Sequence, residues 1–320
     1  MNVREEAKEL RKLWGCFWQA RVLLTANSLR IFDHLRTTKT AAEVAGLINA
    51  DARATEILLD AVASLGLIKK SGENYRNAAA ARHLLVSGAP NYQGDIINHA
   101  DNLWTNWSHL DEIVKTGLPA RRSFGSEAFI RGMHNIAVMK AGEVINSIDL
   151  RGVKRALDLG GGPGTYSLEL ARQIDSVTLF DLPQTIAIAR DIVGKTVLDN
   201  ISFIEGDFLA DDIGSGYDLI FISQVFHAFS GSNNLKTLRK VRAALNSNGL
   251  VVVQEFYLGK DRASPPRSAL FSVNMLVNTH GGRCYTVPEM KAWLSSTGFI
   301  KVRHKISEED VLVSGRKARS

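Results

Sequence analysis

The strongest constraint on the fold is a change of sequence pattern near Arg155. From there to residue 256, short β-type apolar runs alternate with helical patterns. The expected elements are, in order, RALDLG, YSLELARQ, VTLFDLP, TIAIARDIV, ISFIEGD, YDLIFIS, NLKTLRKVRAAL and GLVVVQEF. This alternation predicts an α/β fold, a Rossmann-like, doubly wound parallel sheet. Ligands of such sheets bind at the carboxyl ends of the strands, so the site is expected there.

The first hundred residues follow a helical pattern instead. Apolar residues recur at helical spacing from Leu10 to Leu24, and Thr40 and Glu43 are spaced as a capping box. The run LIKKSGENYRN is typical of a β-hairpin. This order predicts a mostly α-helical winged-helix domain over residues 1–98. A helical connector and the sheet are expected over residues 99–320.

A winged-helix domain can bind DNA or join two subunits. The helix that would enter the major groove carries three acids and one arginine, a balance that repels phosphates. The apolar stripe from Leu10 to Leu24 favours pairing between subunits. We therefore expect a homodimer without a nucleic-acid partner, and a DNA-binding regulator is the alternative.

Composition argues against several other classes of protein. Of the 320 residues, 45% are hydrophobic and 22% charged, which suits two folded domains. No apolar run reaches the roughly 18 residues of a membrane span, and the charged N-terminus has no signal-peptide core. We therefore expect a cytoplasmic protein without membrane contact. The two cysteines and eight histidines match no metal-binding spacing, so no metal is expected.

The first strand of the expected sheet ends in a glycine-rich turn, LDLGGGPG. Counted from Gly160, the sixth position is Thr165, so the third glycine of the dinucleotide fingerprint is missing. Pro163 also removes a backbone donor that a phosphate would use. The turn, with Asp158 before it and Gly162 within it, therefore favours a ligand without phosphates.

Two further acids stand at the ends of the following strands. Asp181 ends VTLFD, where a carboxylate can accept hydrogen bonds from ribose hydroxyls. Asp207 ends ISFIEGD and precedes Phe208, a pair suited to the amino group and ring of adenine. Each acid alone is more often a helix cap or a solvated residue. Three acids at successive strand ends together indicate a binding site.

A histidine follows another strand-like run, in LIFISQVFHAFSG. By position alone, His227 is more often a core residue or a cap than a base. Free imidazole has a pKa of about 6.5, so it is mostly neutral and basic at pH 7. Both interpretations remain open at this point.

The combination of LDLGGGPG, FDLP, EGDF, the strand-end histidine and GGRCYT resembles the class I S-adenosylmethionine-dependent O-methyltransferases. More narrowly, it resembles the small-molecule branch with caffeate-type and bacterial secondary-metabolite members. The resemblance runs from about Leu13 to Val313. It implies S-adenosyl-L-methionine as the cofactor and an N-terminal winged-helix dimerisation domain.

The resemblance implies roles for individual residues. The implied cofactor contacts include Asp158. Gly160 and Gly162 are implied to contact the methionine part, Asp181 and Leu182 the ribose and adenine, and Asp207 and Phe208 the adenine. Ser223 and Phe229 are implied to lie close to the cofactor. His227 is implied as the general base that takes the proton of the acceptor hydroxyl. Glu255 is implied as the acid that orients the imidazole.

The chain departs from the family pattern beside the expected base. Ala228-Phe229 replaces Asp-Trp, and Cys284 stands where the family has a second acid. A neutral thiol cannot replace a carboxylate charge, so His227 would be held from one side only. This favours a more acidic acceptor, such as an activated phenol or enol. A C-methyltransferase, or a cofactor-binding relative with altered or lost chemistry, is the alternative.

The resemblance also places Asn98, Met133, Phe271 and Met275 around the methyl acceptor. Large apolar side chains suit a flat hydrophobic ligand, which one asparagine can direct by a hydrogen bond. Core packing is the ordinary alternative for each Met and Phe. The expected reaction is methyl transfer to a hydroxyl of a hydrophobic, aromatic or polyketide-like small molecule.

Overall fold

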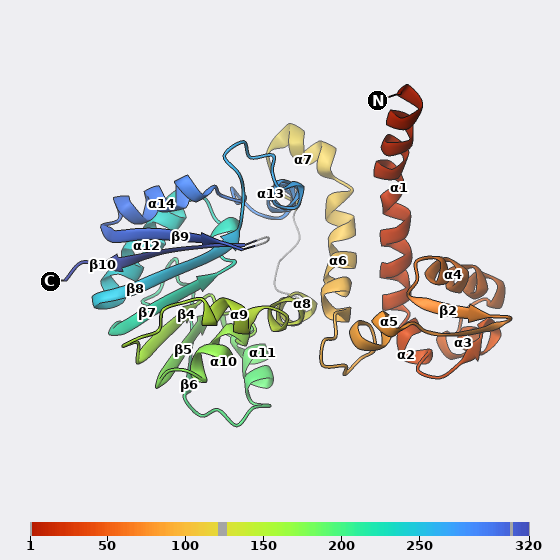
Figure 1. The fold of residues 1–320 in the computed structure, drawn as a ribbon, viewed down its shortest axis with the longest axis horizontal. Helices are drawn as coiled ribbons and strands as arrows, with labels where there is room; N and C mark the ends of the chain where they lie inside the picture. Colours follow the sequence, from red (N-terminus) through yellow and green to blue (C-terminus); the bar gives the residue numbers. More distant parts are fainter. Residues whose placement is uncertain (1, 121–126, 308–309, 320) are drawn as a thin grey trace. The chain divides into compact units, whose positions relative to one another are not determined.

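In the computed structural model, the chain forms two units, Met1–Leu103 and Trp104–Ser320 (Figure 1). The structure describes residues 2–120, 127–307 and 310–319. Within these ranges, no helix has both the length and the apolar character needed to cross a membrane.

The N-terminal unit consists of helices and a small antiparallel sheet of order β1-β3-β2. Its elements are α1 (Val3–Ser28), α2 (Ile31–His34), β1 (Lys39–Thr40), α3 (Ala41–Ile48), α4 (Ala52–Ser64), β2 (Ile68–Ser71), β3 (Asn74–Asn77), α5 (Ala79–Leu84) and most of α6 (Gly94–Trp107). Thr40 and Glu43 form the predicted capping box of α3. The predicted helices and hairpin are therefore present.

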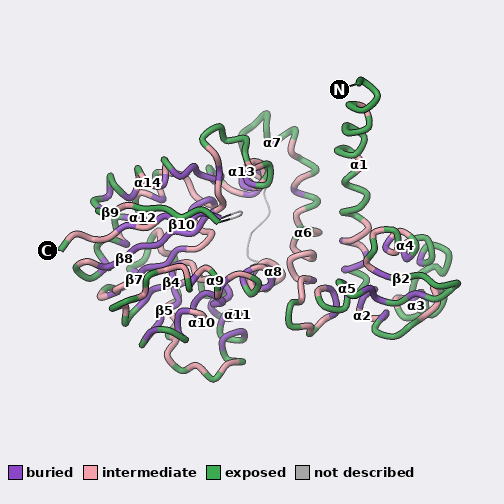
Figure 2. The backbone as a smooth tube through the Cα atoms, in the orientation of Figure 1, coloured by how far each residue is buried: buried purple, intermediate pink, exposed green. Residues whose placement is uncertain are grey.

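Helix α1 has an exposed part and a buried part (Figure 2). Its last turns join the core of this unit, where Ala26, Phe32 and Leu59 are fully buried. Along its first turns, Leu13 is 73% exposed and Phe17 is 50% exposed. An exposed apolar stripe of this kind is typical of a surface that a partner covers.

The second unit is built on a seven-stranded sheet of order β6-β5-β4-β7-β8-β10-β9. Its elements are α7 (Leu110–Thr116), α8 (Glu127–Val138), α9 (Ala141–Asn146), β4 (Arg155–Leu159), α10 (Thr165–Ala171), β5 (Ser176–Asp181), α11 (Pro183–Val193), β6 (Ile201–Glu205), β7 (Tyr217–Ser223), the 3-10 turn η1 (Phe226–Ala228), α12 (Gly231–Ala244), β8 (Leu245–Phe256), α13 (Pro266–Asn278), α14 (Val287–Ser296), β9 (Phe299–Ile306) and β10 (Asp310–Lys317). The predicted α/β class is confirmed.

The central strands are apolar on both faces because helices cover both sides of the sheet (Figure 1). On β7, Leu219 and Phe221 pack on one side with residues of α9 and α10. Ile220 and Ile222 pack on the other side with residues of α12 and α14. This double burial explains why β7 reads as one continuous apolar run.

The sheet is not parallel throughout. Strands β4 to β8 pair in parallel, whereas β10 is antiparallel to both β8 and β9. The alternating pattern up to residue 256 does not predict these last two strands. Most of β9 is exposed, so it lacks the apolar run that marks the buried strands.

The order of the strands reverses its direction at β4. The chain runs outward through β5 and β6, and then returns to place β7 on the other side of β4. In a doubly wound sheet this switch point opens a crevice at the carboxyl ends of the strands. The glycine turn after β4 and the segment after β7 meet there.

Candidate active site

The turn after β4 needs glycine at several positions. Gly160, Gly162 and Gly164 have φ values of +70°, +55° and +80°, which L side chains rarely adopt. A Cβ on Gly160 would lie 2.8 Å from Cγ2 of Val225, which follows β7. A Cβ on Gly162 would meet nothing within 4 Å. The turn therefore packs closely on one side and leaves its backbone open to a ligand on the other.

Asp181, at the end of β5, is tied to this turn. Its Oδ2 accepts a hydrogen bond from the Gly162 N–H at 2.8 Å, and its Oδ1 accepts one from the Leu182 N–H at 2.7 Å. Burial raises the pKa of Asp181, while these two N–H groups oppose the rise. The Thr185 hydroxyl also contacts this carboxylate and lowers its pKa. A carboxylate has about four acceptor positions, so it can still accept from a further hydroxyl group.

Asp158 lies beneath the turn. It is fully buried, and its Oδ2 accepts a hydrogen bond from Ser167 Oγ at 2.7 Å. Its Oδ1 has no hydrogen-bond partner in the described part of the chain. Burial raises the pKa of Asp158 to about 7, against the effect of the Ser167 hydrogen bond. Asp158 thus supports the turn, and a direct contact with a ligand stays a prediction.

The end of β6 brings an acid and an aromatic ring together. Asp207 Oδ1 accepts a hydrogen bond from the Leu209 N–H at 2.8 Å. The ring of Phe208 meets that of Phe229 edge to face, with 5.4 Å between centroids. Leu182, after β5, is 41% exposed. These groups offer apolar surface and a carboxylate.

The donor set fits S-adenosylmethionine better than a dinucleotide. Backbone beside Gly162 is open to a ligand, Asp181 can accept from ribose hydroxyls, and the rings of Phe208 and Phe229 can pack on a purine. The Ser223 hydroxyl is engaged within the sheet, because its Oγ donates to Gln254 Oε1 at 2.9 Å. Its predicted contact with the cofactor would therefore have to be a hydrogen bond that Oγ accepts.

The strand-end histidine is held by Glu255. His227 Nδ1 lies 2.7 Å from Glu255 Oε2, and the His227 backbone N–H donates to Oε1 at 3.2 Å. The strand register explains why the two side chains meet. Ser223, at the end of β7, pairs with Gln254 on β8, and the turn η1 then brings His227 next to Glu255, the residue after Gln254. Both side chains are buried. An ionised carboxylate only accepts, so this contact places the proton on Nδ1 and leaves Nε2 with a free lone pair.

Two phenylalanine rings surround the imidazole. Phe271 on α13 meets the His227 ring edge to face at 5.0 Å, and Phe256 lies 5.8 Å from it. The two phenylalanine rings are 4.3 Å apart. Aromatic walls of this kind suit a flat apolar ligand.

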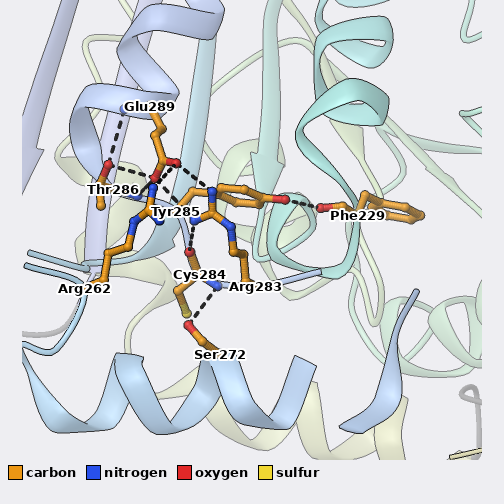
Figure 3. A network of polar contacts seen from close by, with 8 residues as sticks. All are labelled: Phe229, Arg262, Ser272, Arg283, Cys284, Tyr285, Thr286 and Glu289. Carbon is orange, nitrogen blue, oxygen red and sulfur yellow. Dashed lines mark hydrogen bonds and ion pairs between the residues drawn. The ribbon is translucent and has the colours of Figure 1, made fainter. Parts of the chain in front are cut away.

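The segment that carries Cys284 is fixed by polar contacts on three sides (Figure 3). The Cys284 N–H donates to Ser272 Oγ on α13 at 3.1 Å. Tyr285 OH donates to the Phe229 carbonyl at 2.6 Å. Arg283 forms an ion pair with Glu289 of α14 at 2.6 Å. The position of Cys284 is therefore set by α13, by the segment after η1 and by α14.

The Cys284 thiol is neutral in this environment. Burial raises the pKa of Cys284 to about 12, and the negative charge of Glu255 adds to the rise. Glu289 behaves in the opposite way, because hydrogen bonds from Arg283 and Thr286 outweigh its burial and lower its pKa to about 2. The cysteine supplies neither charge nor a general base.

The other residues expected around the acceptor fall in different places. Met275 is buried on α13, one helical turn after Phe271. Met133 is half-buried on α8, a helix that packs on α10 and α11. Asn98 belongs to the N-terminal unit, where its Oδ1 accepts a hydrogen bond from Asn27 Nδ2 at 2.7 Å. The structure places Phe271 beside His227, and the substrate roles of all four residues stay predictions.

Sequence reasoning misses two residues of this region. Phe256 follows the expected acid directly, yet only the fold shows its ring beside His227. Asn274 lies on α13 between the expected contacts Phe271 and Met275. A signal for it exists in the sequence, since Asn274 and Asn278 stand one helical turn apart in an apolar run.

Comparison with known proteins identifies the family. A family model described as an O-methyltransferase domain matches residues 107–300, and one described as an O-methyltransferase dimerisation domain matches residues 12–87. The 3-hydroxy-5-methyl-1-naphthoate 3-O-methyltransferase of Streptomyces sahachiroi is 34% identical over 302 residues, covering 89% of this chain and 87% of the relative. The tetracenomycin polyketide synthesis 8-O-methyl transferase TcmO of Streptomyces glaucescens is 29% identical, covering 97% of both proteins.

Solved structures agree with this assignment. Human N-acetylserotonin methyltransferase in complex with SAM has a TM-score of 0.89 and 26% identity, covering 98% of both chains. PigF with SAH has a TM-score of 0.89 and 28% identity, covering 97% of this chain and 99% of the other. The dimerisation-domain match supports a homodimer. The chain therefore belongs to the O-methyltransferase family and is an S-adenosylmethionine-dependent O-methyltransferase of the secondary-metabolite type.

Proposed function

We propose that the protein methylates a hydroxyl group of a flat, hydrophobic, aromatic or polyketide-like small molecule, with His227 as the general base. The observation that carries this proposal is the buried pair of His227 and Glu255, 2.7 Å apart, beside the rings of Phe256 and Phe271. Two relatives support the substrate class, because their names specify a naphthoate and a tetracenomycin polyketide.

The cofactor, when bound, supplies an electrophilic methyl group. The turn at Gly160 and Gly162, with Asp181 and the rings of Phe208 and Phe229, would hold it at the ends of β4 to β7. His227 Nε2 takes the proton of the acceptor hydroxyl, and Glu255 orients the ring. A positioned base contributes about 10²- to 10⁴-fold to such a step.

The neutral thiol of Cys284 narrows the range of acceptors. With Glu255 alone beside it, His227 lacks the second acid of the family pattern, so its proton abstraction is less strongly assisted. An acceptor whose hydroxyl is already acidic, such as a phenol conjugated with an electron-withdrawing group, needs less assistance. We therefore propose an activated phenol or enol as the acceptor.

The test is methyl transfer itself. Purified protein is incubated with methyl-labelled S-adenosylmethionine and a panel of naphthols, hydroxyquinones and simple phenols, and products are located by mass spectrometry and NMR. We expect O-methylated products, formed fastest from the most acidic hydroxyls. Label on ring carbon would favour the C-methyltransferase alternative, and binding of the cofactor without transfer to any compound would favour a relative with lost chemistry.

We also propose that the exposed stripe of α1, which includes Leu13 and Phe17, pairs two subunits. Replacing both residues by Glu should produce a monomer in sedimentation analysis at micromolar concentration, because two charged side chains would replace the apolar area that the proposed dimer buries. The DNA-binding alternative is disfavoured further by Lys70, which forms an ion pair with Asp60 at 2.6 Å. Tight, salt-sensitive binding of duplex DNA would contradict this interpretation.

A further inference from the structure

A row of side-chain amides runs along α13 beside the ring cluster of His227. Phe271, Asn274 and Asn278 follow one another at spacings of three and four residues, so they share one face of the helix. Phe271 is the residue whose ring meets His227 at 5.0 Å. Asn274 therefore lies one helical turn from the group that contacts the proposed base.

A tryptophan fixes the orientation of the Asn274 amide. Trp107 Nε1 lies 2.9 Å from Asn274 Oδ1, and an indole N–H can only donate. The atom that faces it must be the amide oxygen, which settles an assignment that amides otherwise leave ambiguous. Asn278 Nδ2 donates to the same oxygen at 3.0 Å, and Asn106 Nδ2 donates to Asn278 Oδ1 at 2.9 Å.

This arrangement leaves one donor group without a partner in the part of the chain that the structure describes. Both lone pairs of Asn274 Oδ1 are used, by Trp107 and Asn278, so rotation of the amide would break two hydrogen bonds. Among the described residues, Asn274 Nδ2 donates no hydrogen bond, whereas its Oδ1 accepts two. The side chain is half-buried. A fixed, partly desolvated donor of this kind gains from meeting an acceptor oxygen on a ligand.

We propose that Asn274 Nδ2 donates a hydrogen bond to a carbonyl oxygen of the methyl acceptor, one that is conjugated with the hydroxyl held at His227. This inference rests on the proposed function, whose substrate class it narrows. A neutral carbonyl fits better than a carboxylate, because the buried Glu255 carboxylate already places a negative charge in this region and would repel a second one.

The same hydrogen bond assists the reaction. When His227 takes the proton, the negative charge left on the ligand spreads through the ring to the conjugated carbonyl oxygen. An N–H group aimed at that oxygen stabilises the charge as it develops, as donors of an oxyanion hole do. Asn274 then supplies at the far end of the ligand part of the assistance that a second acid beside His227 would give.

The test compares 6-acetyl-2-naphthol with 2-naphthol, which lacks the carbonyl, in the wild-type enzyme and in Asn274→Asp. Aspartate keeps both hydrogen bonds accepted from Trp107 and Asn278, replaces the donor by an acceptor and adds a negative charge. Asn274→Leu, of similar size and without charge, is measured beside it and should show the same selective loss if the missing donor is the cause. We expect kcat/KM for the ketone to fall by about 10- to 100-fold and that for 2-naphthol by less than about 3-fold. Each loss is the ratio of kcat/KM for wild type to kcat/KM for the variant on the same compound, so the different acidities of the two hydroxyls cancel. Equal losses for both compounds would overturn the proposal.

Two further measurements guard against misfolding and against failure of the proposed function. Trp107→Phe removes the indole donor but leaves the Asn274 amide, so a smaller loss, again confined to the ketone, is expected. Calorimetry with the S-adenosylhomocysteine-loaded protein measures binding of the same naphthols without turnover. If wild-type protein binds the ketone more tightly than 2-naphthol and Asn274→Asp abolishes this preference, the inference is supported, whether or not a methyl group is transferred. A lack of methyl transfer would count only against the proposed function. 6-Hydroxy-2-naphthoate, which carries a carboxylate in place of the ketone, is measured as a third compound. A loss confined to it would overturn the choice of a neutral carbonyl.

Discussion

The cofactor side and the acceptor side of the site are built in different ways. The cofactor side consists of the glycine turn after β4 and acids at the ends of β5 and β6, all within one stretch of alternating strands and helices. The acceptor side joins η1, β8, α13 and the Cys284 segment, which follow one another in the chain and meet through their side chains. The first depends mainly on backbone conformation and strand order. The second depends on contacts between the side chains of different elements.

This difference predicts that substitutions on the cofactor side change cofactor affinity, whereas substitutions on the acceptor side change turnover.

The largest effect is expected for His227→Ala, which removes the proposed base. Turnover should fall by about 10²- to 10⁴-fold, while the affinity for S-adenosylhomocysteine measured by calorimetry stays nearly unchanged. Glu255→Gln, which keeps the imidazole but weakens its orientation, should lose less. An unimpaired His227→Ala enzyme would show that His227 is a packing residue.

Asp158→Asn tests the support of the glycine turn. Burial raises the pKa of Asp158 to about 7, so ionisation is disfavoured in the folded state. The stabilising contribution of the protonated form is complete below the unfolded pKa and is lost as pH rises through about 7. Wild-type protein should therefore lose up to about 4 kcal/mol of unfolding free energy relative to the variant between pH 4 and pH 8.

The measurement for Asp158→Asn is chemical denaturation across this pH range. Ser167→Ala serves as the control, because it removes the hydrogen bond to Asp158 without removing the titrating group. A difference between wild type and Asp158→Asn that does not change with pH would contradict the assignment.

Asp181→Ala should weaken the cofactor side selectively. Removing acceptors for ribose hydroxyls, together with the hydrogen bonds from Gly162 and Leu182, should cost about 1–3 kcal/mol of cofactor binding free energy. Calorimetry with S-adenosylhomocysteine measures this loss. At saturating cofactor the turnover number should change little. A large fall in turnover with unchanged cofactor affinity would erase the distinction between the two sides.

Cys284→Glu should give the smallest effect and sharpen the acceptor side. A second carboxylate beside the base should raise activity toward ordinary phenols by about 10-fold at most, with little change for acidic acceptors. Repulsion from Glu255 limits the gain, because two nearby carboxylates do not both ionise freely. Cys284→Gln, neutral and of similar size, is the matched control. Equal gains in both variants would show that size rather than charge matters at this position.

Much of the cofactor side follows from local sequence patterns. Asp158, Asp181 and Asp207 stand at strand ends that apolar runs define, and positive φ at Gly160 and Gly162 requires residues without a side chain. Strand order then brings the ends together. Spacing along one continuous stretch is therefore enough to predict that these residues lie close to one another.

The acceptor side is less accessible to such reasoning. That Cys284 is buried and neutral depends on α13 and on the Glu255 charge, and neither neighbour is adjacent to it in sequence. The orientation of the Asn274 amide depends on Trp107, which lies 167 positions earlier. The exposed strand β9 also escapes prediction, since pairing with β10 rather than an apolar run holds it in the sheet.

Neighbouring residues along the chain are enough to specify the elements whose stability is local or periodic: the capped helices, the buried parallel strands, the glycine turn and the apolar stripe of α1. These features depend on residues within a few positions of each other, so their pattern is visible in one dimension. Which groups share an environment is visible only in the fold: the rings of Phe256 and Phe271 around His227, the neutral thiol of Cys284, and the Asn274 N–H that donates to no group in the described residues. Burial and hydrogen bonding between distant segments set these properties, because desolvation and electrostatics depend on distance in space.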